Sequence, residues 1–383
     1  MRTTNRLNVT YHGRKVGTMA LYKGRFSAFE YDREWLADGF SISPFSLPLE
    51  QKVFIPKQEP FDGIFGVFAD SLPDGWGRLL VDRLMLKNHM NPYEVGNMDR
   101  LAIVGQSGMG ALCYEPERYF EIEENPIDLD TIAEECRQIL NTESAENLDE
   151  LFRLGGSSGG TRPKILTQID GEEWIIKFPS SADRENIGRQ EYEYSLCARK
   201  CGIPMAETRL FPSKICDGYF GTKRFDRRQK TDGSVERVHM LSVSAVLETS
   251  HRIPNLDYEI LMKLTLELTK DFSEVEKLYR LMCFNVFAHN RDDHSKNFTY
   301  LYEETEDQWR LSPAYDLTYS SSIGGEHATT VYGNGKNPGM KEILAVADQI
   351  GMDGRKSEQI AEEVRNCVKE HLSEFISKNT KVL

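Results

Sequence analysis

The order of strand-like and helix-like segments most constrains what this chain can fold into. Up to about residue 115, and again from about residue 154 to about residue 227, apolar and polar residues alternate between glycine-containing turns, which predicts short strands. From about residue 242 onward, apolar residues recur at helical spacing. Strands that precede helices, instead of alternating with them, indicate an α+β fold.

This order predicts four parts. Residues 1–118 form a β-rich N-terminal module, 119–150 a helical connector, 151–227 a small β-rich lobe, and 228–383 a helical lobe. Within the third part we expect a strand on each side of the glycine run at 155–160, then a turn at Asp170-Gly171 and a further strand. A helix over 185–203 should stop at Gly202. A two-lobed layout of this kind is typical of a nucleotide-binding catalyst.

The connector is strongly acidic. Residues 121–150 hold eleven acidic side chains and one basic side chain, Arg137, while the whole chain carries a net charge of −13. Such a charge disfavours direct binding of nucleic acid through overall attraction. The segment is either a solvated helical connector or a docking surface for a basic partner.

Several classes of protein are excluded by composition. The chain is 39% hydrophobic and 28% charged, as in a globular protein, and no apolar run approaches the ~18 residues of a membrane span. The first residues lack the apolar stretch of a secretory signal. The seven cysteines are scattered and show no C-x-x-C pair, which argues against a disulfide framework or a zinc ribbon. We therefore expect a cytoplasmic protein without a membrane partner.

The glycine run is the first candidate for chemistry. Two glycine pairs flank Ser157-Ser158 and are followed by Thr161-Arg162-Pro163-Lys164. Glycines let backbone N–H groups approach phosphate oxygens, although a flexible loop would have the same composition. The run does not match a Walker A loop, because Pro163 precedes the lysine and Ile165 follows it. The glycines at 105–110 have the wrong spacing for a dinucleotide fingerprint, and we interpret them as structural.

A lysine inside an apolar strand is the second candidate. Lys177 follows Trp174-Ile175-Ile176, so its ammonium must either reach solvent or meet an anion. Glu191 lies on the next helix. A strand lysine held by a helix glutamate is the arrangement that protein kinases use to bind phosphates, although a surface lysine is the simpler interpretation.

The third candidate is the polar run His289–Asn297, which follows a helix apolar enough to be buried. Arg291-Asp292 and then Asn297 reproduce the R-D-x-x-x-x-N spacing of a kinase catalytic loop, in which the aspartate accepts a hydroxyl proton and the amide ligates Mg²⁺. Two alternatives stay open: a transition-metal site and a purely structural turn. The metal site would use His289, Asp292, Asp293 and His294.

The fourth candidate is Asp316 in Ser312-Pro313-Ala314-Tyr315-Asp316, nineteen residues beyond Asn297. It could supply the second Mg²⁺ ligand. Alone this motif says almost nothing, but it completes an ordered set.

Taken together, the segments SSGGTRPK, IIKFP, KRFDR, DDHSKNF and LSPAYDLT resemble the HipA family of bacterial toxin serine/threonine kinases. The N-terminal LPDGWGR and VGQSGMGAL resemble the N-terminal domain of that family, so the resemblance spans nearly the whole chain. It implies a two-lobed, protein-kinase-like α+β fold and phosphorylation of serine or threonine that depends on ATP and Mg²⁺.

The resemblance also implies roles for individual residues. Asp292 corresponds to the catalytic acceptor, Asn297 and Asp316 to the Mg²⁺ ligands, and Ser157 to the autophosphorylated serine, with Ser158 as the alternative. The implied nucleotide-binding residues are Gly159, Gly160, Thr161, Arg162, Pro163, Lys164, Lys177, Lys223, Arg224, Phe225, His294, Lys296, Asn297, Tyr315 and Asp316. Among these, Lys223-Arg224-Phe225 would form the hinge that meets adenine.

The family further implies a HipB-like helix-turn-helix antitoxin, through which the kinase would meet DNA only indirectly. Its members phosphorylate aminoacyl-tRNA synthetases, so such an enzyme is an expected class of substrate. Two alternatives stay open: a kinase of the same fold that acts on a lipid or small molecule, and a non-catalytic corepressor. Phosphorylation of Ser157 would place negative charge in a loop built to hold phosphate and switch the enzyme off.

Overall fold

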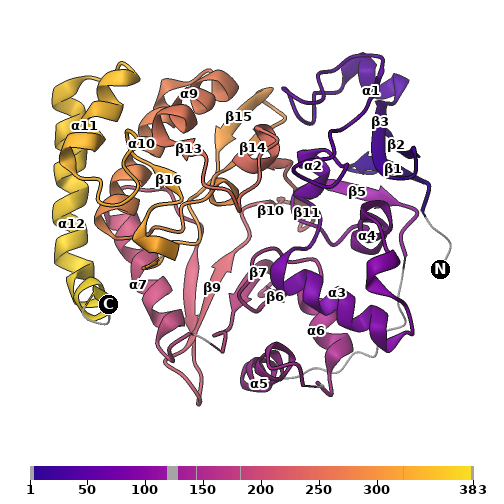
Figure 1. The fold of residues 1–383 in the computed structure, drawn as a ribbon, viewed down its shortest axis with the longest axis horizontal. Helices are drawn as coiled ribbons and strands as arrows, with labels where there is room; N and C mark the ends of the chain where they lie inside the picture. Colours follow the sequence, from indigo (N-terminus) through magenta and orange to yellow (C-terminus); the bar gives the residue numbers. More distant parts are fainter. Residues whose placement is uncertain (1–3, 119–127, 144, 182, 322, 381–383) are drawn as a thin grey trace. The chain divides into compact units, whose positions relative to one another are not determined.

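The computed structural model describes residues 4–118, 128–143, 145–181, 183–321 and 323–380. The chain forms two compact units (Figure 1). Unit 1 consists of Met1–Gly188, Leu210–Leu241 and Ala245–Thr249, and unit 2 of Arg189–Arg209, Ser242–Ser244 and Ser250–Leu383. Among the described helices, none combines the length and the apolar character that crossing a bilayer requires.

Unit 1 begins with a five-stranded antiparallel sheet in the spatial order β4-β3-β2-β1-β5. Its strands are β1 (Arg6–Tyr11), β2 (Arg14–Tyr22), β3 (Phe26–Tyr31), β4 (Val53–Phe54) and β5 (Leu112–Glu115). The turn His12-Gly13 joins β1 to β2 with φ of 48° and 77°, as a tight hairpin turn requires. Alternate residues of β1 are buried apolar side chains, which confirms the predicted strand pattern.

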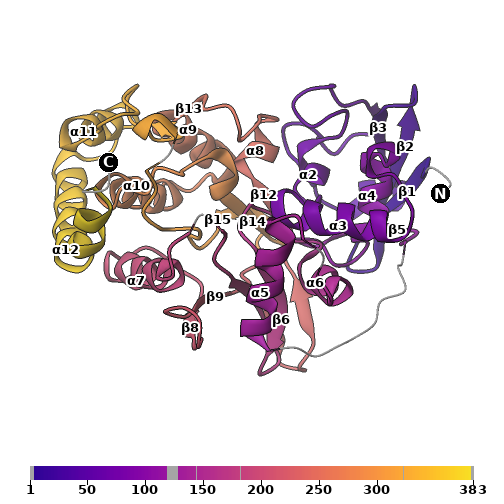
Figure 2. The same ribbon diagram turned by 60° about the horizontal axis from the view of Figure 1, so that its bottom comes forward.

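The helices of unit 1 surround this sheet and a second core. They are α1 (Arg33–Asp38), α2 (Gly66–Ala69), α3 (Gly75–Lys87), the 3₁₀ turn η1 (Pro92–Glu94), α4 (Asn97–Val104), α5 (Leu129–Leu140) and α6 (Leu148–Gly155). In the second core, side chains of α3, α5 and α6 pack together with residues of the strands that follow; they include Trp76, Leu80, Ile132, Cys136, Ile139, Leu151, Ile165, Ile176 and Phe178. Figure 2 shows α5 and α6 beside β6 (Lys164–Ile169).

The acidic segment is helical, as predicted, but its described part is not a solvated connector. Residues 119–127 and 144 lie outside the described residues. Within α5 and α6 one apolar face belongs to the second core, and two of the acids are buried. Glu135 accepts hydrogen bonds from Asn147, and Glu150 pairs with Arg153 at 2.6 Å. The high charge content of the sequence hid the apolar stripe of two amphipathic helices.

The strand predicted just before the glycine run is wrong. The chain is helical there, since α6 ends at Gly155 and Gly156 is its C-cap. Leu151 and Leu154 are three residues apart and both buried, which is a helical spacing that is too short to stand out in the sequence.

After the glycine run, β6, β7 (Glu172–Lys177), β9 (Tyr219–Lys223) and β8 (Thr208–Phe211) form a sheet in the order β6-β7-β9-β8. Asp170 and Gly171 have φ of 54° and 80°, which confirms the predicted turn. A small hairpin of β10 (Arg227–Gln229) and β11 (Val235–Arg237) follows.

Unit 2 is mainly helical, as predicted. Its helices are α7 (Ile187–Lys200), α9 (Tyr258–Thr269), α10 (Phe272–Phe287), α11 (Met340–Gln349) and α12 (Gly354–Thr380), and α10 packs against α9 and α12. Its shorter elements are β13 (Leu256–Asp257), η2 (Ser295–Asn297), β14 (Thr299–Glu303), β15 (Gln308–Leu311), η3 (Ile323–Gly325) and β16 (Thr329–Thr330), while β12 (Met240–Ser242) and α8 (Val243–Val246) are divided between the two units. Gly202 has φ of 74° just beyond α7, where the predicted stop lies.

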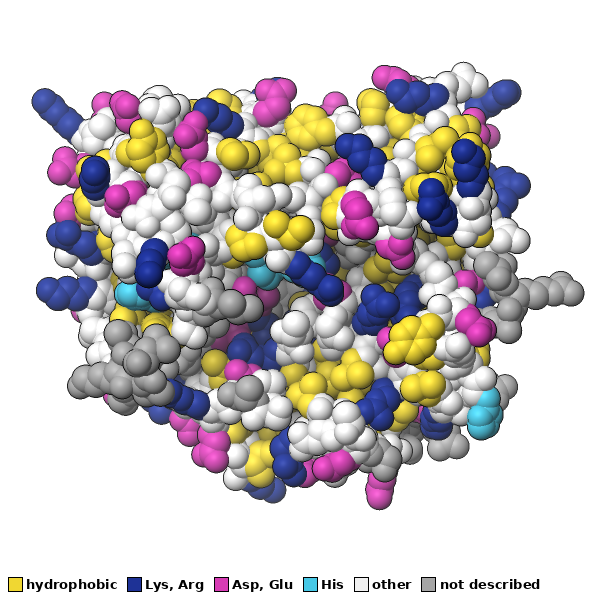
Figure 3. Space-filling model, viewed as in Figure 1, with side chains coloured by type: hydrophobic (Ala, Val, Ile, Leu, Met, Phe, Trp, Pro, Cys, Tyr) yellow, Lys and Arg dark blue, Asp and Glu magenta, His cyan; other side chains and the backbone are white. Residues whose placement is uncertain are grey.

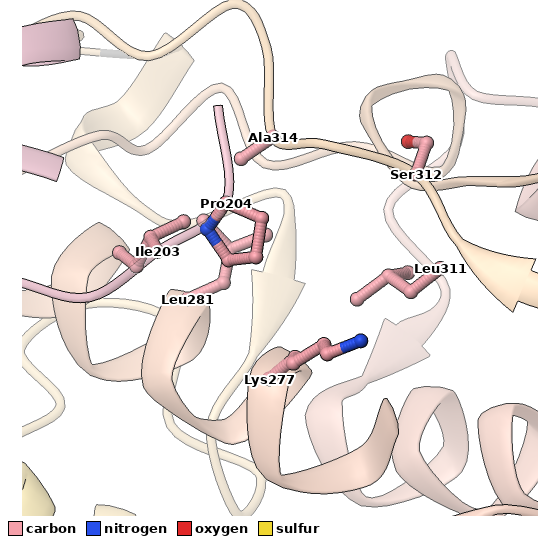
Figure 4. A pocket seen from close by; sticks show the side chains of 7 residues that line it. All are labelled: Ile203, Pro204, Lys277, Leu281, Leu311, Ser312 and Ala314. Carbon is pink, nitrogen blue, oxygen red and sulfur yellow. The ribbon is translucent and has the colours of Figure 1, made fainter. Parts of the chain in front are cut away.

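One cavity of unit 2 lies between α10 and the end of β15 (Figure 4). Its volume is about 10 Å³, room for about one water molecule. The lining residues are Ile203, Pro204, Lys277, Leu281, Leu311, Ser312 and Ala314. The cavity is far too small for a nucleotide, so the candidate site has to be built from the polar segments.

Candidate active site

The polar run 289–297 starts from a fixed point at the end of a buried helix. α10 ends at Phe287, and His289 turns the chain away with φ of 54°. The N–H of Asn290 donates back to the carbonyl of Asn285 at 2.9 Å. These contacts fix the direction in which the loop leaves α10.

A buried hydrogen-bond network holds the middle of this loop. The carboxylate of Asp293 is fully buried, accepts from the hydroxyl of Tyr258 at 2.8 Å and lies 2.9 Å from Nδ1 of His327. Asn285 donates to the same hydroxyl at 2.8 Å and accepts from Asn290 at 2.9 Å. Burial, together with the Asp293 carboxylate, raises the pKa of Tyr258 well above its ordinary value, so the phenol stays a donor. Asp293 is a positioning residue.

The alternative transition-metal site gains no support. Asp293 is engaged as described, and the ring of His289 stacks on Tyr319 with centroids 6.2 Å apart. Within the described residues, His289, Asp292, Asp293 and His294 do not bring three ligand atoms to one point.

Asp292 and Asn297 are joined by the loop itself. The Asn297 amide donates through Nδ2 to the backbone carbonyl of Asp292 at 2.6 Å. Since Nδ2 is used in this way, Oδ1 is the end of the amide left for another partner. The Asp292 side chain is 64% exposed, with Nε2 of His294 3.8 Å away, and Nδ1 of His294 accepts from the N–H of Lys296 at 3.2 Å. The Asn297 amide thus closes a turn on Asp292, five residues earlier, as the spacing predicted. The Asp292 carboxylate is exposed to solvent.

Residues before and after Asp316 in the chain make hydrogen bonds that hold this segment near the 292–297 turn. The hydroxyl of Tyr315 donates to the carbonyl of Lys296 at 2.6 Å and lies 2.6 Å from the hydroxyl of Thr299. Further along, Ser320 N–H donates to the carbonyl of His289 at 3.0 Å. Asp316 itself has φ of 55°, a left-handed conformation that a short polar residue tolerates. Unit 2 therefore brings Asp292, Asn297 and Asp316 into one region.

In unit 1 the glycine run is an ordered loop between α6 and β6. Ser158 is 1% exposed, and its hydroxyl donates to the carbonyl of Gly155 at 2.6 Å. Ser157 is only half-buried. Gly159 is half-buried and Gly160 and Thr161 are exposed. The two serines are thus in different environments although they are adjacent in the sequence.

The segment Asp74–Gly77, at the start of α3, contacts the glycine loop and holds it in place. The Gly160 N–H donates to the Asp74 carboxylate, and the Trp76 N–H donates to the Gly160 carbonyl at 2.9 Å. The fit is close: a Cβ added at Gly75 would lie 2.3 Å from the Gly160 carbonyl oxygen, and one at Gly77 would lie 2.2 Å from that of Ser158. Glycine is required at both positions because no side chain fits there. We did not predict this contact from the sequence, where the motif LPDGWGR was the only indication of it.

Lys164 and Lys177 lie opposite each other on two neighbouring strands. They are direct partners in the antiparallel register of β6 and β7, and each is only 8% exposed. Directly opposed like charges destabilise a sheet unless an anion compensates them. Lys177 Nζ also lies over the ring of Phe220, 5.5 Å from its centroid. Two buried lysines thus lie opposite each other on the strands that follow the glycine loop.

Other predicted nucleotide-binding residues are engaged within unit 1. Arg162 Nε pairs with Asp183 at 2.9 Å, and the carbonyl of Pro163 accepts from Phe178 N–H at 2.8 Å. Lys223 pairs with Glu172. Phe225 is half-buried.

Arg224 belongs to a buried ionic network. Its guanidinium pairs with Asp226 at 2.7 Å, and Arg227 pairs with the same carboxylate at 2.8 Å. Burial alone would raise the pKa of Asp226, but the two guanidinium groups lower it well below its ordinary value. Asp226 also accepts from Gly110 N–H at 2.7 Å, and Arg227 donates to the carbonyl of Gly108 at 3.0 Å. The glycines at 105–110 are thus structural, as we interpreted them.

Lys177 belongs to unit 1 and Glu191 to unit 2, and their pairing stays a prediction.

Comparisons with known proteins agree with the resemblance. The chain matches the model of the HipA N-terminal domain over residues 7–115 and that of the HipA-like C-terminal domain over residues 156–372. Y4mE of Sinorhizobium fredii, which is named as a kinase, is 26% identical over 351 residues, covering 82% of this chain and 77% of that protein.

A solved structure shows the same fold. HipA of Shewanella oneidensis MR-1, solved with HipB and its operator DNA, matches with a TM-score of 0.70 and 17% identity over 97% of this chain and 90% of that chain. CtkA, a proinflammatory kinase of Helicobacter pylori, matches 57% of this chain and 90% of that chain at 16% identity. Its TM-score of 0.36 is too low to indicate a shared fold. Because the C-terminal model alone covers more than half of the 383 residues, the chain belongs to the HipA family.

Proposed function

We propose that this protein is a serine/threonine protein kinase that uses ATP and Mg²⁺ and acts as the toxin of a toxin–antitoxin pair. The observation that carries the proposal is the arrangement in unit 2, where Asn297 closes a turn on Asp292 and Tyr315 holds Asp316 beside that turn. This arrangement would suit phosphoryl transfer, with Asp292 as the catalytic carboxylate and Asn297 and Asp316 as oxygen ligands.

Unit 1 supplies basic groups. Lys164 and Lys177 are both buried and lie opposite each other on the two strands that follow the glycine loop. This combination suits the phosphates of a nucleotide. We keep the 223–225 segment as the proposed hinge that meets adenine.

The residues divide the work as follows. Asp292 orients the acceptor hydroxyl and takes its proton as the oxygen bonds to the γ-phosphorus and the bond to the bridging oxygen of ADP breaks. Asn297 Oδ1 and the Asp316 carboxylate would hold Mg²⁺, which neutralises charge on the phosphates when bound. Lys164 and Lys177 hold the phosphates in place.

We assign autophosphorylation to Ser157. The hydroxyl of Ser158 is buried and bonded to Gly155, whereas Ser157 is half-buried. A phosphoryl group on Ser157 would add about −1.5 to −2 charges close to the Asp74 carboxylate that holds Gly160. This repulsion favours release of the loop and loss of the phosphate site.

Intact-mass spectrometry with Mg²⁺ and ATP tests the proposal. The wild-type chain should gain one phosphoryl group that maps to Ser157, and Asp292→Asn should gain none. Asp348→Asn, an exposed carboxylate on α11, is the matched control and should behave as wild type. A wild-type chain that gains no phosphoryl group and still binds an antitoxin would support the corepressor alternative.

We further propose a basic helix-turn-helix antitoxin as partner, since the Shewanella structure contains HipB and operator DNA. On the face drawn in Figure 3, acidic and basic side chains are interleaved, so no single acidic patch dominates it. The exposed Glu143 and Glu146, between α5 and α6, remain the candidate contact in the described residues. Reversal of both charges should weaken antitoxin binding, and unchanged affinity would discard this surface. An aminoacyl-tRNA synthetase stays the expected class of substrate.

A further inference from the structure

Three cysteines that are scattered in the sequence converge in unit 2. Cys197 lies on α7, Cys201 lies one residue beyond its end, and Cys367 lies on α12. Their sulfur atoms all lie within 4.8 Å of one another. Cys197 and Cys201 are four residues apart, so a helix places them on one face, whereas a search for C-x-x-C pairs passes over them.

The cluster belongs to the packing of two helices. Sγ of Cys197 lies 3.9 Å from the carbonyl oxygen of Cys367, and Sγ of Cys367 lies 4.0 Å from that of Cys197. Cys197 is 1% exposed and Cys201 4%, while Cys367 is half-buried. One side of the cluster is therefore close to solvent, which gives an ion a way in.

The separations suit a metal ion. Zinc–thiolate bonds of about 2.3 Å in a tetrahedral site put sulfurs roughly 3.8 Å apart. The cluster needs a contraction of at most about 1 Å to reach that spacing. A disulfide would require two sulfurs to approach to about 2.05 Å and would leave the third cysteine out.

Basic side chains lie near the cluster. Lys200 is next to Cys201 in the chain. Arg280 donates to the backbone carbonyl of Cys201 at 3.0 Å, which brings a second positive charge near the site. A thiophilic divalent cation would offset the cost of burying thiolates at this position.

Access is available from a surface groove. The groove has a volume of about 420 Å³ and includes Gly202, next to Cys201, and Glu363, one turn before Cys367. Arg280 and Glu363 pair across it at 3.3 Å. A hydrated ion entering here would meet the half-buried Cys367 first.

We propose that Cys197, Cys201 and Cys367 form a zinc-binding site with three thiolate ligands and water as the fourth. Binding would replace the three thiol protons by one divalent cation and fasten the end of α7 to α12. The three cysteines are not among the proposed nucleotide-binding residues. Metal binding here can therefore be tested independently of the proposed kinase activity.

Cobalt titration of the full chain tests this proposal. The reduced, chelator-treated protein is titrated with Co²⁺, and a thiolate-to-cobalt charge-transfer band that saturates at one equivalent is expected. Zn²⁺ should displace the cobalt and raise the melting temperature. Absence of the band, or a band that needs more than one equivalent, would overturn the proposal.

Variants identify the ligands. Cys367→Ser, at the half-buried position, should weaken Co²⁺ binding by at least about tenfold and abolish the rise in melting temperature with Zn²⁺. Cys216→Ser, a half-buried cysteine of unit 1, is the matched control and should bind as wild type. Equal losses in both variants, or no loss in Cys367→Ser, would contradict the assignment. The wild-type titration remains decisive if a variant fails to fold.

Discussion

Single residues in this protein are held by contacts that give each a distinct role. Asp292 is exposed while its neighbour Asp293 is fully buried, so two adjacent carboxylates lie in different environments. Ser157 is half-buried and Ser158 is buried. The sequence spacing pointed to Asp292 and Asn297 because their contact closes within five residues. It could not distinguish the serines, since burial depends on distant packing.

Asp226 should be among the most sensitive carboxylates for stability. Asp226→Asn would leave the buried Arg224 and Arg227 without a counter-charge, and we expect a loss of about 3–5 kcal/mol in the free energy of unfolding. Urea denaturation measures this loss. Asp232→Asn, in the exposed turn between β10 and β11, should change stability by less than about 0.5 kcal/mol. Similar losses for both variants would contradict the network's importance.

His239 should make stability depend on pH. Burial lowers its pKa from 6.5 to about 4, and its Nε2 donates to the Ile42 carbonyl at 2.8 Å. Below pH 6.5 the unfolded chain gains a proton here, whereas the folded chain does not until about pH 4. The free energy of unfolding should therefore fall by roughly 3 kcal/mol as pH drops through this window.

His239→Gln removes the titrating group and keeps a donor for Ile42. Denaturation curves of both proteins between pH 7 and pH 4.5 should show a shallower pH dependence for the variant. Equal pH slopes would mean that His239 does not titrate as described.

At the scale of elements, local patterns were predictable and long-range contacts were not. The Asp170-Gly171 turn and the stop at Gly202 follow from residue types that favour positive φ. By contrast, the hydrogen bond between Asp74 and Gly160 spans 86 residues, and that between Asp226 and Gly110 spans 116. Nothing in the spacing of a chain encodes such pairs, so the support beneath the glycine loop became visible only in the structure.

The close fit of α3 beneath the glycine loop gives a further prediction. Gly77→Ala would bring a Cβ to 2.2 Å from the Ser158 carbonyl oxygen, so the loop must move. We expect ATP affinity to fall by about tenfold or more, since several backbone donors lose their positions. Gly96→Ala, whose Cβ would meet its nearest neighbour at 3.9 Å, is the control. Isothermal titration calorimetry measures both, and unchanged affinity in Gly77→Ala would show that the loop position does not matter.

At the scale of the whole molecule, the proposed site residues are divided between the two units. Unit 1 carries the opposed lysines and the glycine loop, and unit 2 carries the carboxylates and the amide. The order of strands before helices predicted this division, and the HipA family membership agrees with it. The fold therefore followed from patterning, whereas the cysteine cluster did not, because Cys197 and Cys367 are 170 residues apart.

The central claim is that the protein binds ATP together with Mg²⁺, and binding of ATP with and without Mg²⁺ tests it most directly. Lys177→Met should lower ATP affinity by about tenfold to a hundredfold in both conditions, because a charged hydrogen-bond partner of the phosphates is lost. Asp316→Asn should lower affinity only when Mg²⁺ is present. Lys263→Met, an exposed lysine on α9, should have no effect. ATP affinity that is unchanged in both Lys177→Met and Asp316→Asn would contradict the account.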